Sequence, residues 1–183
     1  MTTLPPSPAG KSAADFDEPL ALLLACHDRV RSSILLLREI GQSVAAGRID
    51  AGVHRAAADV LHYFDRAAPQ HHEDEEQHIF PCVLAQAGGD IVRQAVLKLQ
   101  EEHLAMEAQW ARLRVALAAL ADGHRVAYDA MQIAAATRFC DLYEEHARLE
   151  EEVVFPIAEN LLDAVARRRA GTEMVRRRRA GRR

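Results

Sequence analysis

The stretch His71-His72-Glu73-Asp74-Glu75-Glu76-Gln77-His78-Ile79-Phe80-Pro81 is followed 75 residues later by His146-Ala147-Arg148-Leu149-Glu150-Glu151-Glu152-Val153-Val154-Phe155-Pro156. Both stretches read H-x-x-x-E-E-x-x-[IV]-F-P. A spacing of four residues is about one turn of an α-helix, so the His and the first Glu of each copy share a helical face. The repeat therefore predicts two helices that each direct an imidazole and a carboxylate toward the same side.

A lone histidine precedes each copy of this motif at nearly the same distance. His27 lies 44 residues before His71, and His103 lies 43 residues before His146. The chain therefore reads as two helical hairpins, and packing them about a quasi-two-fold axis brings four imidazoles and two carboxylates to one centre. This set suits two metal ions, each with two imidazoles, that share the carboxylates as bridges. The candidate ligands are His27, His71, Glu75, His103, His146 and Glu150.

The chemistry of these ligands narrows the choice of metal. Imidazole and carboxylate without thiolate suit iron, manganese or zinc, and an inward pair of carboxylates favours a redox-capable di-iron centre. The i, i+4 spacing also separates the site from bundles that use Glu-x-x-His at i, i+3. An ionised group in a core costs several kcal/mol unless it is paired or bound to a metal, so these positions require such an explanation.

Apolar residues recur at three- and four-residue spacing along four long segments. This pattern predicts helices over about 20–46, 52–86, 90–121 and 126–169. Pro69 is expected to kink or break the second helix, and Pro81 and Pro156 to bend the second and fourth just past the motifs. Alternating β-branched runs and hairpin turns are absent. We therefore predict an all-α, up-down-up-down four-helix bundle over residues 18–166.

The two ends of the chain differ from this body. Residues 1–17 are rich in Pro, Ser, Gly and Ala and are expected to form a disordered arm. Residues 167–183 hold nine arginines and one acid, a charge of +8, whereas the rest of the chain carries −12. This basic tail has three readings: it binds nucleic acid or acidic lipid, it is a disordered solubilising tail, or it folds back on the acidic body. No aromatic residues alternate with the arginines, so base stacking has no support.

Composition sets the remaining bounds. The chain has 183 residues, 49% hydrophobic and 27% charged, which is typical of one globular domain. The three cysteines form no CxxC pair, no apolar run approaches about 18 residues, and the N-terminus lacks the pattern of a secretory signal. We therefore expect a cytoplasmic protein without a membrane span.

The doubled motif, together with the lone histidines His27 and His103, resembles the hemerythrin-like (HHE cation-binding) family over about residues 18–166. This resemblance implies an oxo- or hydroxo-bridged site of two iron ions that binds dioxygen or a related small ligand. Carried over residue by residue, the ligands are the six residues given above. Oxygen-carrying members place a second histidine four residues after the third-helix histidine, and here that position is Glu107.

Glu107 is therefore a seventh candidate ligand. A carboxylate there would make the site harder and lower its potential, which turns the interpretation from reversible oxygen carriage toward iron or peroxide handling or sensing. The alternative is a solvated residue at the edge of the helical stripe. We expect a non-haem di-iron protein that binds oxygen, nitric oxide, peroxide or iron itself as sensor, store or scavenger. An enzyme that consumes peroxide or nitric oxide, and a metal-sensing regulator that acts through the basic tail, stay open as alternatives, with the regulator ranked last.

The other polar residues near the motifs receive simpler assignments. His72 has Ala147 as its counterpart in the repeat and is assigned a supporting or solvated position. Glu76 and Glu151 either orient a neighbouring imidazole or face water. The remaining histidines, expected to be neighbours of the site or surface residues, are His54, His62, His78 and His124.

Overall fold

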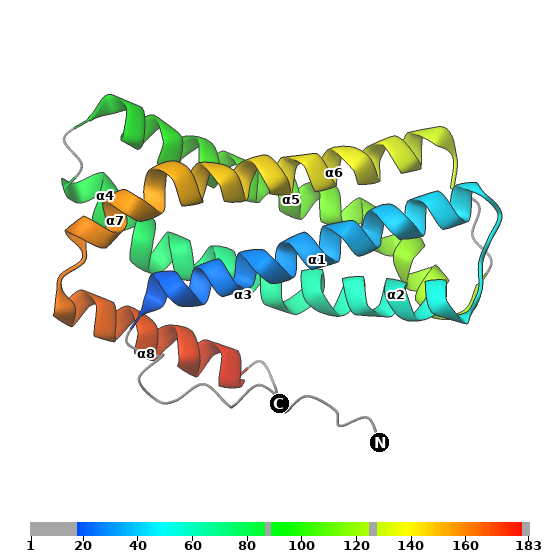
Figure 1. Ribbon diagram of the computed structural model, residues 1–183, viewed down its shortest axis with the longest axis horizontal. Coiled ribbons are helices and arrows are strands. Elements are labelled where there is room, and N and C mark those ends of the chain that lie inside the picture. Colours follow the sequence, from blue (N-terminus) through cyan, green and yellow to red (C-terminus); the bar gives the residue numbers. More distant parts are fainter. Residues whose placement is uncertain (1–17, 87–88, 125–127, 181–183) are drawn as a thin grey trace, which may run out of the picture.

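The computed structural model describes residues 18–86, 89–124 and 128–180, and within these ranges every regular element is a helix (Figure 1). The predicted all-α class is therefore confirmed. The arm assigned to residues 1–17 lies outside the described residues. None of the described helices combines the length and apolar character that crossing a membrane requires.

Four long rods pack into a helical bundle. The first is α1 (Pro19–Ala45) and the third is α5 (Asp90–Ala121). The second rod is composite and consists, in chain order, of α2 (Ala51–His62), η2 (Tyr63–Ala67), α3 (Ala68–Asp74), η3 (Glu75–Ile79) and α4 (Phe80–Gln86). The fourth rod consists of α6 (Ala130–Leu149), η4 (Glu150–Val154) and α7 (Phe155–Leu161). Both α1 and α5 pack against α2 and against α6. The second and fourth rods therefore lie between the first and third around one core.

The two hairpins end their first helices in the same way. Gly47 at the end of α1 has φ +68°, and Gly123 at the end of α5 has φ +85°. In both turns the glycine N–H donates to the carbonyl three residues back, and the following N–H donates to the carbonyl five residues back. Glycine adopts this left-handed conformation without a Cβ penalty, which ends a helix sharply. The internal repeat seen in the ligand motifs thus extends to the turns.

The prolines coincide with widened turns rather than with helix ends. The segments η2, η3 and η4 are π-helical, and the N–H that follows each donates to the carbonyl five residues back. Pro69, Pro81 and Pro156 each stand one residue further on. Proline has no N–H and its ring clashes with the carbonyl four residues back, and a wider turn relieves that clash. Of the kink or break expected at Pro69, the break does not occur, because the rod continues through a π segment.

Buried apolar residues fall into two clusters with polar residues between them. Along α1, His27 lies between Leu23 of one cluster and Val30 of the other. Along α5, His103 lies between Leu99 and Met106 in the same manner. Apolar packing thus flanks the polar centre on both sides, and these surroundings of low polarity strengthen electrostatic interactions within it.

The end of the chain departs from the expected helix over 126–169. Leu162 takes an extended conformation with ψ 113°, and a separate helix, α8 (Ala164–Ala180), follows. It packs against α1 and α3 and crosses beside the start of α1 (Figure 1). Its own residues Ala170 and Met174 are buried. The described part of the basic tail is therefore a folded helix on the body, which is the third of the readings considered above.

Candidate metal centre

Six of the seven candidate ligands come together in the core. They form two groups of four that share Glu75 and Glu150: one group adds His27 and His71, and the other adds His103 and His146. Within each group one potential ligand atom per residue lies within 4.8 Å of the others. All six side chains are buried, and both carboxylates are fully buried. One pair of imidazoles thus belongs to each hairpin, whereas both carboxylates are common to the two groups.

Each carboxylate faces both imidazole pairs. Glu75 directs Oε1 to His71 Nε2 at 3.2 Å and Oε2 to His103 Nε2 at 3.6 Å. Glu150 directs Oε2 to His27 Nε2 at 3.1 Å and Oε1 to His146 Nε2 at 3.2 Å. The Nε2 atoms within each pair lie 3.1 Å and 3.0 Å apart. The two carboxylates thus lie between the two imidazole pairs, an arrangement that could hold metal ions.

The carboxylate oxygens test whether a metal fits. All four oxygens of Glu75 and Glu150 are buried without a hydrogen-bond partner among the described residues. An unsatisfied buried acceptor costs about 1–3 kcal/mol, and more when it is charged. Cations between the imidazole pairs would satisfy these oxygens and use nitrogen and oxygen donors of the kind that iron, manganese and zinc accept. The residues present therefore fit a metal pair.

The electrostatics of the centre point the same way. Burial and the facing Glu150 carboxylate raise the pKa of Glu75 well above its ordinary value. Burial opposes the ionisation of Glu150 as well, but His146 and His27 hold the pKa of Glu150 well below its usual range. Two buried carboxylates at this separation cannot both ionise without added positive charge. Bound metal ions would supply that charge.

Three of the four imidazoles are held by a second carboxylate. His27 Nδ1 bonds Glu151 at 2.6 Å, and His103 Nδ1 bonds Glu76 at 3.0 Å. Both glutamates follow a ligand glutamate directly, so the orienting alternative offered for them in the sequence analysis is the one observed. A carboxylate on Nδ1 fixes the tautomer and leaves Nε2 free for a metal.

The third such carboxylate was not anticipated. His146 Nδ1 bonds Glu102 at 3.0 Å, and burial notwithstanding, Glu150 and Glu102 raise the pKa of His146 to about 9. The equivalent of Glu102 in the first hairpin is Cys26, and His71 Nδ1 is buried without a partner. The sequence offered a signal for this difference, because the residue directly before the lone histidine is a carboxylate in the second hairpin and a cysteine in the first. The two halves of the centre therefore have the same candidate ligands but differ in the carboxylates that bond the Nδ1 atoms of their imidazoles.

Glu107 is not brought into either group. It is exposed on α5 and lines a cavity of about 570 Å³ together with His72, His103 and Trp110. Since residues four apart on a helix differ by about 40° in direction, Glu107 faces this cavity while His103 faces the centre. Its ligation stays a prediction.

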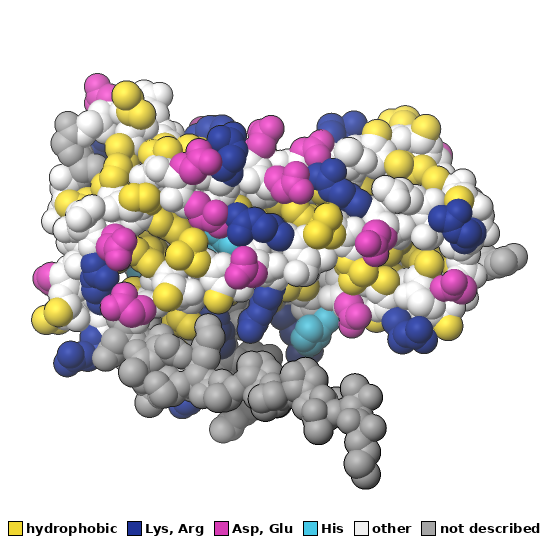
Figure 2. Space-filling model, viewed as in Figure 1, with side chains coloured by type: hydrophobic (Ala, Val, Ile, Leu, Met, Phe, Trp, Pro, Cys, Tyr) yellow, Lys and Arg dark blue, Asp and Glu magenta, His cyan; other side chains and the backbone are white. Residues whose placement is uncertain are grey.

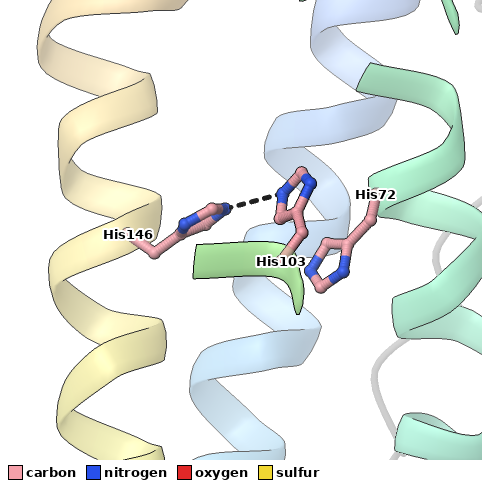
Figure 3. Close-up of side chains that lie close together, drawn as sticks. All are labelled: His72, His103 and His146. Atoms are coloured by element: carbon pink, nitrogen blue, oxygen red, sulfur yellow. Dashed lines mark hydrogen bonds between the residues drawn. The ribbon is translucent and has the colours of Figure 1, made fainter. Parts of the chain in front are cut away.

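His72 lies closer to the centre than its repeat counterpart suggested. By distance alone it forms a third group with His103 and His146 (Figure 3). Its ring stacks on His103 with centroids 4.0 Å apart and planes 12° apart, and its Nε2 has no hydrogen-bond partner. Ring lone pairs lie in the ring plane, so two stacked rings do not point them at one ion. His72 is therefore a wall of the cavity beside the centre rather than a ligand in this arrangement.

The other histidines lie away from the two groups. His54 bonds the Leu120 carbonyl at 2.6 Å, and His124 bonds the Ala119 carbonyl at 3.1 Å. His78 lies 3.5 Å from Glu173 of α8, and His62 is exposed. Their assignment outside the ligand set agrees with these positions.

The family model of the hemerythrin HHE cation binding domain matches residues 18–158. A Haemophilus influenzae protein described as uncharacterized is 30% identical over 165 residues, which cover 90% of this chain and 92% of that protein. The matched range includes all six residues of the two groups and ends before α8.

Proposed function

The chain belongs to the hemerythrin family of HHE cation-binding domains, and we propose that it holds two iron ions and binds a small ligand beside them. The observation that carries the proposal is the pair of buried carboxylates, each with one oxygen toward either imidazole pair. Two redox-capable ions would supply electrons and open coordination positions for oxygen, nitric oxide or peroxide. The proposed role is that of a sensor, store or scavenger.

The proposal includes the up-down-up-down order of the four rods. It is supported by the positions of the helix ends: α1 ends, α2 begins, α5 ends and α6 begins at one end of the bundle, whereas α4 ends and α5 begins at the other (Figure 1). This order brings the second helix of each hairpin beside the first helix of the other. Glu76 consequently reaches His103, and Glu151 reaches His27.

The residues of this chain divide the work. The six ligands hold the ions, and the carboxylates on Nδ1 keep three imidazoles in the ligating tautomer. The cavity beside His103 would give a small molecule access to an ion held by His103 and His146. His72 and Tyr143 line this cavity and can hydrogen-bond a polar ligand in it.

Metal analysis of purified full-length chain tests the proposal. We expect about two iron ions per chain in the wild type and loss of both in Glu150→Gln, because that carboxylate bridges the two sites. His146→Ala should lose about one ion, and His62→Ala, an exposed control, none. Near-ultraviolet absorption should follow the iron content. Full metal content in Glu150→Gln and His146→Ala, or zinc in place of iron in the wild type, would overturn the proposal.

A second candidate is an enzyme that consumes peroxide or nitric oxide. It is favoured by the presence of Glu107 in the wall of the cavity that reaches His103. Steady turnover of peroxide or nitric oxide by the iron-loaded chain, lost in Glu107→Ala while the iron content is kept, would support it. Stoichiometric binding of peroxide or nitric oxide without turnover would contradict the enzyme proposal and support the binding function only.

A further inference from the structure

A second cavity lies on the other side of the second rod. It has a volume of about 180 Å³, is lined by α1, α2, η2, α3 and α8, and opens to the surface, where Arg29 and Arg66 are exposed. The larger cavity lies between the same rod and α5. Its walls include Tyr63 and Gln70. Water occupies about 30 Å³ per molecule, so the space holds about six waters or one small polar ion with a few waters.

The charge of this cavity is one-sided. Arg29, Arg66 and Arg178 line it together with His62, and no acidic residue does. Within the described ranges, neither Arg29 nor Arg66 has a hydrogen bond or an ion pair with an acid. The larger cavity is the reverse, because Glu73, Glu76 and Glu107 line it without an arginine or lysine. The two sides of the metal-binding rod thus differ in sign.

The nearby acids are engaged elsewhere. Asp65, next to Arg66, accepts hydrogen bonds from Trp110 and Arg114 on the opposite side of the rod. Asp28, next to Arg29, lies 3.6 Å from Arg31. Arg178 bonds Asp74 through Nη1, while its Nη2 lies at the cavity 3.5 Å from Cys26 Sγ. The positive charge around the cavity is therefore only partly balanced.

We propose that this cavity binds a small oxyanion of the size of phosphate or nitrate. Guanidinium groups suit such anions because their donors match pairs of oxygens. The Gln70 amide N–H₂ offers a further donor on the same wall, whereas the Tyr63 hydroxyl donates to the Cys26 carbonyl at 3.4 Å. The volume of about 180 Å³ suits an ion of this size with a few waters. The site uses no residue of the metal centre, so it does not depend on the proposed iron function.

Calorimetric titration of the full-length, metal-loaded chain with inorganic phosphate, repeated with nitrate, tests this site. We expect one anion per chain in the wild type. Arg29→Gln and Arg66→Gln should each weaken phosphate binding about tenfold, because the loss of one hydrogen bond to a charged group lowers affinity by about that factor. The matched control is Arg112→Gln, an exposed arginine on α5 away from the cavity, and it should bind as the wild type does.

Two results would overturn the proposal. One is phosphate affinity that is unchanged in both Arg29→Gln and Arg66→Gln, which would place the anion elsewhere, including on the metal ions. The other is no saturable binding of either anion to the wild type at millimolar concentration. Circular dichroism and metal content equal to the wild type in both variants ensure that a loss of binding reports the cavity and not a loss of folding.

Discussion

The carboxylate of Asp74 is the main polar link between α8 and the bundle. It is fully buried and accepts hydrogen bonds from Arg177 and, at 2.5 Å, from Arg178. Asp74→Asn keeps the shape but removes the charge and turns an amide N–H₂ toward a guanidinium. Each charge-assisted hydrogen bond is worth about 1.5–3 kcal/mol. Both arginines are partly exposed, at 16% and 23%, and regain water when α8 separates, so we expect a cost of about 3 kcal/mol at the low end of the sum.

A neighbouring residue offers the matched control. Glu73 also pairs with Arg177, at 3.1 Å, but its side chain is 48% exposed. Exposed ion pairs contribute about 0–1 kcal/mol, so Glu73→Gln should cost less than about 1 kcal/mol. The two substitutions remove one carboxylate charge each from adjacent positions on one helix. The expected difference between them therefore reports burial and not net charge.

Urea unfolding followed by far-ultraviolet circular dichroism gives the free energy of unfolding for both variants. Hydrogen exchange then locates the effect, because α8 should lose protection in Asp74→Asn before α5 does. Trypsin should cut among the arginines of α8 faster in this variant. The reasoning is refuted if Asp74→Asn costs no more than Glu73→Gln, or if the exchange rates in α8 are unchanged.

Three further predictions concern the rest of the fold. The hydrogen bonds from Arg114 and Trp110 outweigh burial and lower the pKa of Asp65. The stability that these hydrogen bonds provide is therefore present above the unfolded pKa of about 3.9 and is lost as the pH falls below it. After discounting for exposure, Asp65→Asn should lower the free energy of unfolding by about 1 kcal/mol at pH 7 and by less at pH 3. An equal cost in urea unfolding at the two pH values would contradict this. Leu117→Ala, at a core position that is 1% exposed, should cost about 3 kcal/mol, whereas Val115→Ala, at 70% exposed, should stay within about 0.5 kcal/mol in the same assay. Burial raises the pKa of Cys140 to about 11, so a thiol reagent followed by mass spectrometry should label Cys82 first and Cys140 only on unfolding.

The clustering of the six candidate ligands could be predicted from sequence because it follows from local helix geometry. A four-residue spacing places His71 with Glu75, and His146 with Glu150, on one face whatever the rest of the chain does. The duplication then supplied the long-range information that a single motif lacks, since it paired His27 with His103. The prediction of which residues gather is for this reason good for the six central positions.

Packing between the rods, and not the motif, determines which other side chains lie near the centre. Glu107 satisfies the same four-residue spacing from His103, yet it is exposed and faces the larger cavity. His72 has no counterpart in the repeat, yet its ring stacks on His103. Both outcomes depend on the angle at which α5 meets the second rod, which no local pattern encodes. The three π segments have a similar origin: proline signals a disturbed helix, but the neighbouring rods decide whether it breaks or widens.

The fate of the basic tail shows how charge acts when it has a partner. Arginines in sequence repel one another in isolation, and a stretch of +8 therefore suggests an extended segment in search of an anion. In the fold the anions are carboxylates of the same chain. Asp74 accepts hydrogen bonds from Arg177 and Arg178, and Glu18 accepts one from Arg167. On the face shown in Figure 2, acidic and basic side chains are interspersed over the bundle. Nucleic acid would have to displace these carboxylates before it gained the same arginines, so its binding should be weak in the wild type and increase in Asp74→Asn at low salt. Equal affinity of the two proteins for duplex DNA would show that the arginines of α8 are available without leaving the body.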